Sequence, residues 1–252
     1  MHVLVIGEQG RLRSKNLEAL KLAGYKIEYI APYVPKSDER GLIEDIRFQK
    51  ALLGRVLNKG EVGCWMAHHL ARISIATRAC HEFHLVLEDD ADCRYLPEAG
   101  ELLKIAERSI DNALPGLANI FITTPPELSG KPSIKRVLAP NAGTVGYLLN
   151  SKAAQLDLNF EEVRTTADWP SQFFSCGFFE SSNFGVLEWP GQSTIGVRQQ
   201  YDSPVRFYLK SFSRILASVR EGVKPREALW ASFTAPLLRD IHNRFSRTKP
   251  RG

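Results

Sequence analysis

Three acidic residues follow one another directly after an apolar run. Residues 85–87 lead into Glu88, Asp89 and Asp90, and Asp92 comes two positions later. Neighbouring carboxylates repel one another, and a bound divalent cation relieves that repulsion. Mg²⁺ and Mn²⁺ prefer oxygen ligands and often take only one or two carboxylates, with substrate phosphates as further ligands. On these residues alone, a metal site and a solvated acidic turn are equally good interpretations.

The direction of the acidic side chains depends on the backbone that carries them. On a strand, side chains two residues apart point the same way. Glu88 and Asp90 therefore share one direction, and Asp92 joins them if the extended geometry continues. Under the metal interpretation, Asp90 is the candidate principal ligand and Asp92 the candidate second ligand.

The cluster belongs to a chain in which expected strands and helices alternate. Apolar runs predict strands over residues 3–6, 26–30, 84–87, 119–123, 144–149 and 184–187. Helical spacing predicts helices over 11–23, 61–79, 96–110 and 152–156, with Ser151 as the N-cap of the last, and weaker helical signals over 42–57. This alternation predicts an α/β domain, in which ligands bind at the carboxyl ends of the strands.

Length and composition are those of a globular protein with a large core. The chain has 252 residues, 44% of them hydrophobic, and a net charge of +5. We expect a domain over residues 1–202 and a basic helical appendage over 203–252. The appendage either packs on the domain or binds an anionic membrane surface, and its apolar stripe between Arg and Lys favours the membrane. Basic charge also suits nucleic acid, but no nucleic-acid-binding module is recognisable.

The expected location is the cytoplasm, on the inner face of the membrane if the appendage binds lipid. The first apolar run is too short for a signal peptide, and no run approaches the roughly 18 residues of a membrane span. The four cysteines form no CxxC pair, and three of them lie in expected helices or strands, which suggests buried free thiols.

Five segments, in order, resemble the motifs of glycosyltransferase family 25, which includes bacterial lipooligosaccharide galactosyltransferases and collagen galactosyltransferases. The similar segments are 60–68 (GEVGCWMAH), 85–91 (LVLEDDA), 143–149 (GTVGYLL), 167–170 (ADWP) and 190–195 (PGQSTI). They resemble GE-x-GC-x-x-SH, LILEDDA, GTHAYLI, ADWP and P-x-x-Q…S-x-I, over about residues 3–197. Ala67 and Val145 replace a family serine and histidine, and the last motif is shortened.

The resemblance implies a GT-A-like, Rossmann-like single domain with a mixed central sheet. It also implies a metal-dependent, inverting transfer of a hexose, galactose or glucose, from a UDP-sugar. The acceptor would be a saccharide or lipid-linked glycan in lipopolysaccharide, lipooligosaccharide or other surface glycan synthesis. The cofactor would be Mn²⁺ or Mg²⁺. Glu88 and Asp89 would contact the ribose or the metal shell, beside Asp90.

Further residues are assigned with the help of the motifs. Glu61 and His68 lie two helical turns apart on one face, and they either border the donor pocket or serve as a helix cap and a core histidine. Arg11 and Arg13 either contact the nucleotide and its phosphates or are solvated helix residues. Cys64 is interpreted as a core residue.

The acceptor side of the site comes from later segments. An inverting transfer needs a base to take the acceptor hydroxyl proton, and Asp168 is the candidate. Its position at an expected helix start favours the ionised carboxylate, although it also suits a simple N-cap. Trp169 either stacks on a sugar or belongs to the core, and Gln192 is assigned to the acceptor cleft.

Two other function classes remain open at this point. The same acidic cluster would serve a metal-dependent phosphohydrolase. A non-catalytic relative of the family is the other alternative, although the retained Glu88-Asp89-Asp90 cluster and Asp168 argue against it.

Overall fold

The computed structural model describes residues 1–7, 14–32, 46, 49, 55–78, 83–126, 130–137, 143–159, 173, 176–188, 216 and 219–220. The weak helical signal over 42–57 and the appendage over 203–252 lie almost entirely outside the described residues. The same holds for five expected site residues: Arg11, Arg13, Asp168, Trp169 and Gln192.

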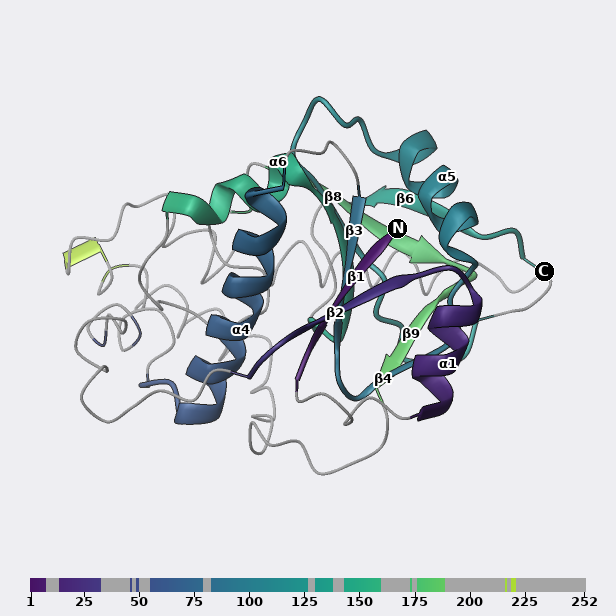
Figure 1. Cartoon of the computed structure of the whole chain (residues 1–252). Helices are drawn as coiled ribbons and strands as arrows, with labels where there is room; N and C mark the ends of the chain where they lie inside the picture. The colour runs from purple at the N-terminus through teal and green to yellow at the C-terminus, as the bar shows by residue number, and fades with distance from the viewer. Residues whose placement is uncertain are drawn as a thin grey trace.

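A mixed seven-stranded sheet forms the centre of the described structure (Figure 1), in the order β2-β1-β3-β7-β5-β8-β6. Its strands are β1 (His2–Ile6), β2 (Lys26–Ile30), β3 (Phe83–Glu88), β5 (Gly116–Asn119), β6 (Ser133–Val137), β7 (Gly146–Asn150) and β8 (Gly177–Ser182). Strands β2, β1 and β3 are parallel, whereas β7 runs antiparallel to β3 and β5. A second, two-stranded sheet pairs β4 (Ala91–Tyr95) with β9 (Gly185–Glu188).

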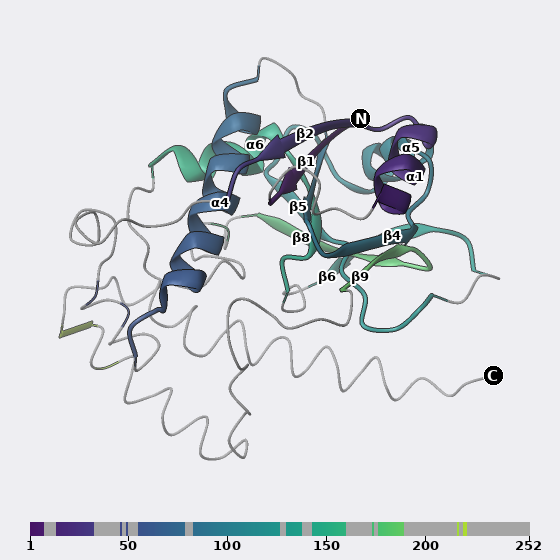
Figure 2. The same cartoon turned by 60° about the horizontal axis from the view of Figure 1, so that its bottom comes forward.

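Helices cover both faces of the central sheet (Figures 1 and 2). On one face lie α4 (Lys59–Ala76), α6 (Ser151–Ala154) and the short 3₁₀ helix η1 (Gln155–Asn159), and on the other α1 (Ser14–Leu22) and α5 (Ala99–Ser109). Alternate residues of β1 enter different cores, as the two-residue strand period requires. Val3 and Val5 pack in the core that includes α1 and α5, whereas Leu4 and Ile6 pack in the core that includes α4.

This layered arrangement confirms the predicted α/β class and the mixed central sheet, and it is compatible with a Rossmann-like fold. The expected strands over 3–6, 26–30, 84–87 and 144–149 correspond to β1, β2, β3 and β7. The helix predicted over 61–79 is α4, which begins two residues earlier, after the N-cap Asn58. In the described part of the chain, no helix has both the length and the apolar character needed to cross a bilayer.

The strand predicted over 119–123 is wrong, because the chain changes sheets within that apolar run. Strand β5 ends at Asn119, whose side chain accepts a hydrogen bond from the Phe121 backbone at 2.9 Å. Phe121 then forms a parallel bridge with Val186 of β9. The run is apolar because it passes from one sheet to the other, with Ile120 buried in the core and Phe121 packed against it.

The N-cap predicted at Ser151 is also wrong, by one residue. Asn150 caps α6, since its side-chain oxygen accepts the Ala153 backbone N–H at 3.0 Å. Four of the described strands are absent from the sequence prediction: β4, β6 and β8 have no expected counterpart, and β5 shares only Asn119 with the run over 119–123. The residues of β6 include two that are exposed, Lys135 and Arg136, so its sequence carries little apolar signal.

Candidate functional site

The acidic cluster lies at the carboxyl end of the parallel pair β1 and β3. Ile6 is in register with Glu88, so Gly7 and Asp89 are neighbours just beyond the paired strands. Gly7 has a φ of +144°, a conformation that glycine adopts far more readily than other residues. A β-carbon at Gly7 would lie 2.3 Å from Asp89 Oδ2, so the Asp89 carboxylate fits only against a bare backbone.

Asp90 carries a carboxylate oxygen that has no protein partner. The chain turns at Asp89 and Asp90, and Asp90 Oδ1 is buried without a hydrogen bond. Burial and, to a smaller extent, the nearby carboxylates of Glu88, Glu188 and Asp89 together raise the pKa of Asp90 to about 7. A cation would supply both the missing partner and the missing positive charge. The cluster therefore fits an ion that takes oxygen ligands.

The turn changes the position of Asp92 relative to the cluster. The extended geometry assumed from Glu88 to Asp92 is wrong, because the chain reverses before β4 begins. The Asp92 side chain is buried and accepts hydrogen bonds from Arg94, at 2.9 Å from Nε and 2.6 Å from Nη2. The structure thus gives Asp92 a cationic partner within β4, and its role as a metal ligand stays a prediction.

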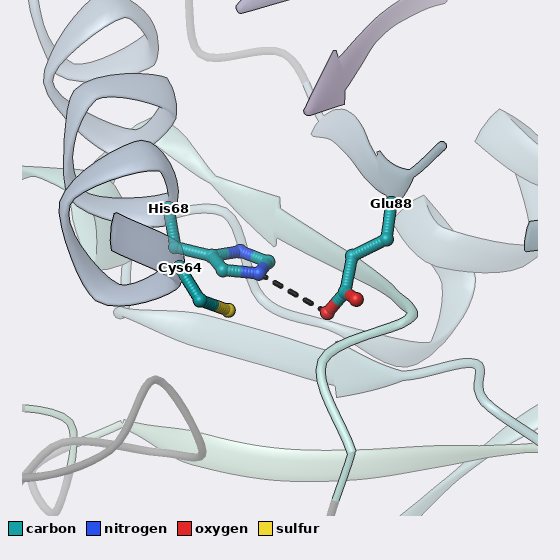
Figure 3. Close-up of side chains that lie close together, drawn as sticks. All are labelled: Cys64, His68 and Glu88. Carbon is teal, nitrogen blue, oxygen red and sulfur yellow. Dashed lines mark hydrogen bonds and ion pairs between the residues drawn. The ribbon is translucent and has the colours of Figure 1, made fainter. Parts of the chain in front are cut away.

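Glu88 connects the cluster to α4 and to the residues before β7. Thr144 Oγ1 donates to Glu88 Oε1 at 2.8 Å, and His68 Nε2 lies 3.2 Å from the same oxygen. Cys64, one turn before His68, extends toward the same place (Figure 3). The ligand atoms of Cys64, His68 and Glu88 all lie within 4.8 Å of one another.

A buried polar network lies behind His68. Its Nδ1 is 3.1 Å from Tyr147 Oη, which also accepts from Arg72 Nη1 at 3.4 Å. Arg72 Nε in turn donates to the buried carboxylate of Asp157. Burial raises the pKa of Tyr147 to about 12, so the phenol stays protonated at neutral pH. The Tyr147 hydroxyl therefore contacts one nitrogen of His68, and Arg72 holds that hydroxyl, while Nε2 of His68 faces Glu88.

Glu61 serves as part of the helix cap. Asn58 accepts the Glu61 backbone N–H, and Glu61 Oε2 accepts the Asn58 backbone N–H, both at 2.9 Å, which is a complete capping box. Arg55 donates to both Glu61 oxygens, at 2.5 and 2.6 Å. Burial alone would raise the pKa of Glu61, but the bonds from Arg55 and Asn58 leave it below its ordinary value. The capping interpretation is confirmed, and a donor contact stays a prediction.

Three of the five motif segments meet in one place. A single hydrogen-bonded group contains His68 from the helix of segment 60–68, Glu88 from the strand end of 85–91, and Thr144 from the residues of 143–149 that precede β7. Segments 167–170 and 190–195 lie outside the described residues. The structure thus brings together Glu88, Asp89, Asp90 and His68 among the expected site residues.

The sequence interpretation missed Thr144, Tyr147 and Arg72. Thr144 and Tyr147 belong to the motif segment 143–149, from which no site residue was predicted. Arg72 lies four residues after His68, and an arginine on the buried face of a helix could have signalled a polar network. Cys64 was taken for a core residue, but it is only half-buried.

Comparison with protein-family models gave no match for this chain, and comparison with the sequences of curated proteins gave none either.

Proposed function

We propose that the chain is a metal-dependent glycosyltransferase of GT-A-like fold. It would transfer a hexose, galactose or glucose, from a UDP-sugar to a saccharide or lipid-linked acceptor in the synthesis of lipopolysaccharide or another surface glycan. The observation that carries the proposal is the buried oxygen of Asp90, which lacks a partner beside Glu88 and Asp89 at the carboxyl end of parallel strands. Ligands of open α/β sheets bind at such strand ends.

The donor set of this cluster is suited to Mn²⁺ or Mg²⁺. Asp90 would hold the ion, and Glu88 or Asp89 would contribute to its shell or contact the ribose. When bound, the ion neutralises charge on the diphosphate leaving group. Glu88 can orient such a ligand because Thr144 and His68 both fix one of its oxygens. Gly7 supports the arrangement by leaving room for the Asp89 carboxylate.

The acceptor half of the proposal rests on the family resemblance. Asp168 would take the proton of the acceptor hydroxyl in an inverting displacement. Trp169 and Gln192 would contact the acceptor, and Arg11 and Arg13 the donor phosphates. The appendage over 203–252 would hold the enzyme on the inner face of the cytoplasmic membrane. Of that segment the described residues are Leu216, Val219 and Arg220, all exposed, and two exposed apolar side chains beside an arginine suit a lipid surface.

A donor panel tests the proposal directly. The purified chain is incubated with UDP-galactose, UDP-glucose and other UDP-hexoses, with and without Mn²⁺, and released UDP is measured. We expect Mn²⁺-dependent release that is lost in Asp90→Asn and kept in Glu107→Gln, which removes an exposed carboxylate from α5. Absence of UDP release together with absence of UDP binding by calorimetry would overturn the proposal.

A phosphohydrolase is the second candidate because it would use the same carboxylates. Phosphate release from simple phosphoesters, without affinity for UDP, would favour it. Both activities depend on Asp90, so the discriminating measurement is nucleotide binding rather than the effect of the substitution.

A further inference from the structure

The side chains of Cys64, His68 and Glu88 bring a sulfur, a nitrogen and an oxygen ligand to one place (Figure 3). Cys64 and His68 are four residues apart on α4, so one turn of helix separates them on the same face. Glu88 approaches from the end of β3, with its Oε1 3.2 Å from His68 Nε2. All three ligand atoms lie within 4.8 Å of one another.

We propose that these three side chains form a binding site for a borderline-soft divalent transition metal, with Zn²⁺ as the ion that fits best. Zn²⁺ binds thiolate, imidazole and carboxylate at about 2.0–2.3 Å, so its ligand atoms lie roughly 3.3–3.8 Å apart in a tetrahedron. The observed spacing reaches that range with small rotations of the Cys64 and Glu88 side chains. The site shares Glu88 with the oxygen cluster, but its other two ligands come from α4 and not from Asp89 or Asp90. It does not depend on sugar transfer.

The groups that surround the three ligands suit metal binding. A metal on His68 Nε2 requires the imidazole proton to be on Nδ1, where Tyr147 Oη lies at 3.1 Å and can accept it. Thr144 Oγ1 donates to Glu88 Oε1 at 2.8 Å and holds that carboxylate in place. Metal binding would displace the Nε2–H···Oε1 contact and release the thiol proton of Cys64 to solvent.

Ligand type separates the two ions. Thiolate selects against Mg²⁺ and Mn²⁺, which prefer oxygen ligands, whereas Asp90 with its neighbouring carboxylates offers oxygen only. Three protein ligands leave a fourth position for water or a substrate atom, which is the arrangement of catalytic rather than structural zinc sites. Cys64 and Glu88 are half-buried whereas His68 is fully buried, so the ion would enter from their side.

Cobalt substitution tests the site, because Co²⁺ replaces Zn²⁺ and reports a sulfur ligand by thiolate-to-metal charge-transfer absorption. Untagged full-length protein is titrated with Co²⁺ and then with Zn²⁺. We expect a charge-transfer band that saturates at one Co²⁺ per chain, and loss of the band when Zn²⁺ displaces Co²⁺. Cys64→Ser should abolish the band and lower Zn²⁺ affinity, whereas Cys93→Ala, which removes a buried thiol in β4, should change neither.

Further variants separate this site from the oxygen cluster and from general damage. Tyr147→Phe should weaken Zn²⁺ binding by about 10–100-fold, since it removes the acceptor for the His68 proton. Asp90→Asn should leave the Co²⁺ band intact and remove only the Mn²⁺ response. Circular dichroism checks that each variant is folded. Absence of the band in the folded wild-type protein, or its persistence in Cys64→Ser, would overturn the proposal whether or not the chain transfers sugar.

Discussion

The carboxylate of Asp89 lies against the backbone of Gly7, so close that a β-carbon at position 7 would fall 2.3 Å from Asp89 Oδ2. The contact joins the ends of two parallel strands, because Ile6 and Glu88 are in register one residue earlier. The shape of the acidic cluster therefore depends on the absence of a side chain in a different segment, 82 positions away.

Replacing Gly7 by alanine should disturb both stability and the cluster. The substitution puts a side chain at a φ of +144° and forces Asp89 to move, so we expect a loss of about 1–3 kcal/mol in the free energy of unfolding. The Mn²⁺ response should fall as well. Gly100→Ala is the matched control: nothing lies within 4 Å of its added β-carbon, and in α5 it should gain up to about 1 kcal/mol. Urea unfolding measures the free energy of unfolding of both variants. Equal stability of Gly7→Ala and the wild-type protein would contradict the assignment.

Asp90→Asn should stabilise the metal-free protein while it removes the metal response. In the absence of a cation, Asp90 is partly buried among the carboxylates of Glu88, Asp89 and Glu188. A neutral amide of the same shape relieves that repulsion, by on the order of 1 kcal/mol after allowance for solvent screening. Thermal unfolding at mildly alkaline pH should show a higher Tm for the variant. Added Mn²⁺ should raise the Tm of the wild-type protein only. A lower Tm in the metal-free variant would mean that Asp90 has a structural role instead.

The sequence predicts those strands and helices whose own apolar pattern matches the residues that are buried in the fold. Strand β3 is an apolar run in a buried central position, and α4 carries its buried residues at helical spacing, so both are recognised. Strands β6 and β8 are not recognised. The exposed Lys135 and Arg136 interrupt the apolar pattern of β6, and β8 is held by pairing with β5 on one side and β6 on the other. The run after Asn119 fails for the opposite reason, because its apolar residues serve two sheets.

For the candidate site, too, the sequence identifies residues that are adjacent in the chain but not their partners from distant segments. Glu88, Asp89 and Asp90 are recognisable because they are adjacent acids at a strand end, but the partners of Glu88 come from segments 20 and 56 residues away. The direction expected for Asp92 required an extended chain, whereas the chain turns at Asp89 and Asp90. Aspartates are themselves common in turns, so the same residues suited both interpretations. For Glu61 the sequence supported both a helix cap and a donor contact, but it did not identify Asn58 as the partner in the capping box.

The buried ion pair of Arg72 and Asp157 should be essential to the fold. Asp157 is fully buried and accepts from Arg72, so Asp157→Ala leaves a guanidinium in the core without its counter-charge. The expected cost is about 3–5 kcal/mol. Glu28→Gln offers a comparison, since Glu28 pairs with Arg78 near the surface and should cost less than about 1 kcal/mol. Chemical denaturation of both variants provides the measurement. Similar small losses would show that the core pair is dispensable.

Glu61 can be tested for its two roles with a pair of substitutions. Glutamine also completes a capping box, so Glu61→Gln should retain most of the stability, whereas Glu61→Ala should lose about 1 kcal/mol. If Glu61 only caps α4, UDP binding by calorimetry should be the same in the wild-type protein and Glu61→Gln. Weaker UDP binding by the fully stable Glu61→Gln protein would instead support a donor contact.

His84 should make the fold sensitive to mild acid. Burial and, to a smaller extent, the positive charges of Arg78 and His2 together lower the pKa of His84 to about 4. The unfolded chain binds this proton below about pH 6.5, whereas the folded protein resists it down to about pH 4. Stability is therefore fully present above the unfolded pKa and falls as the pH drops through this window, by at most about 3 kcal/mol.

The measurement is urea unfolding of the wild-type protein and His84→Gln between about pH 4 and about pH 7. Carboxylates titrate in the same window, so the informative quantity is the difference between the two proteins at each pH. His84→Gln should show a shallower loss of stability toward acid, because its side chain takes up no proton. His2→Gln is the matched control: its ring centroid lies 6.1 Å from that of His84 on the neighbouring strand, and most of the wild-type slope should survive there. Parallel curves for the wild-type protein and His84→Gln would show that the buried imidazole accepts its proton without cost to the fold.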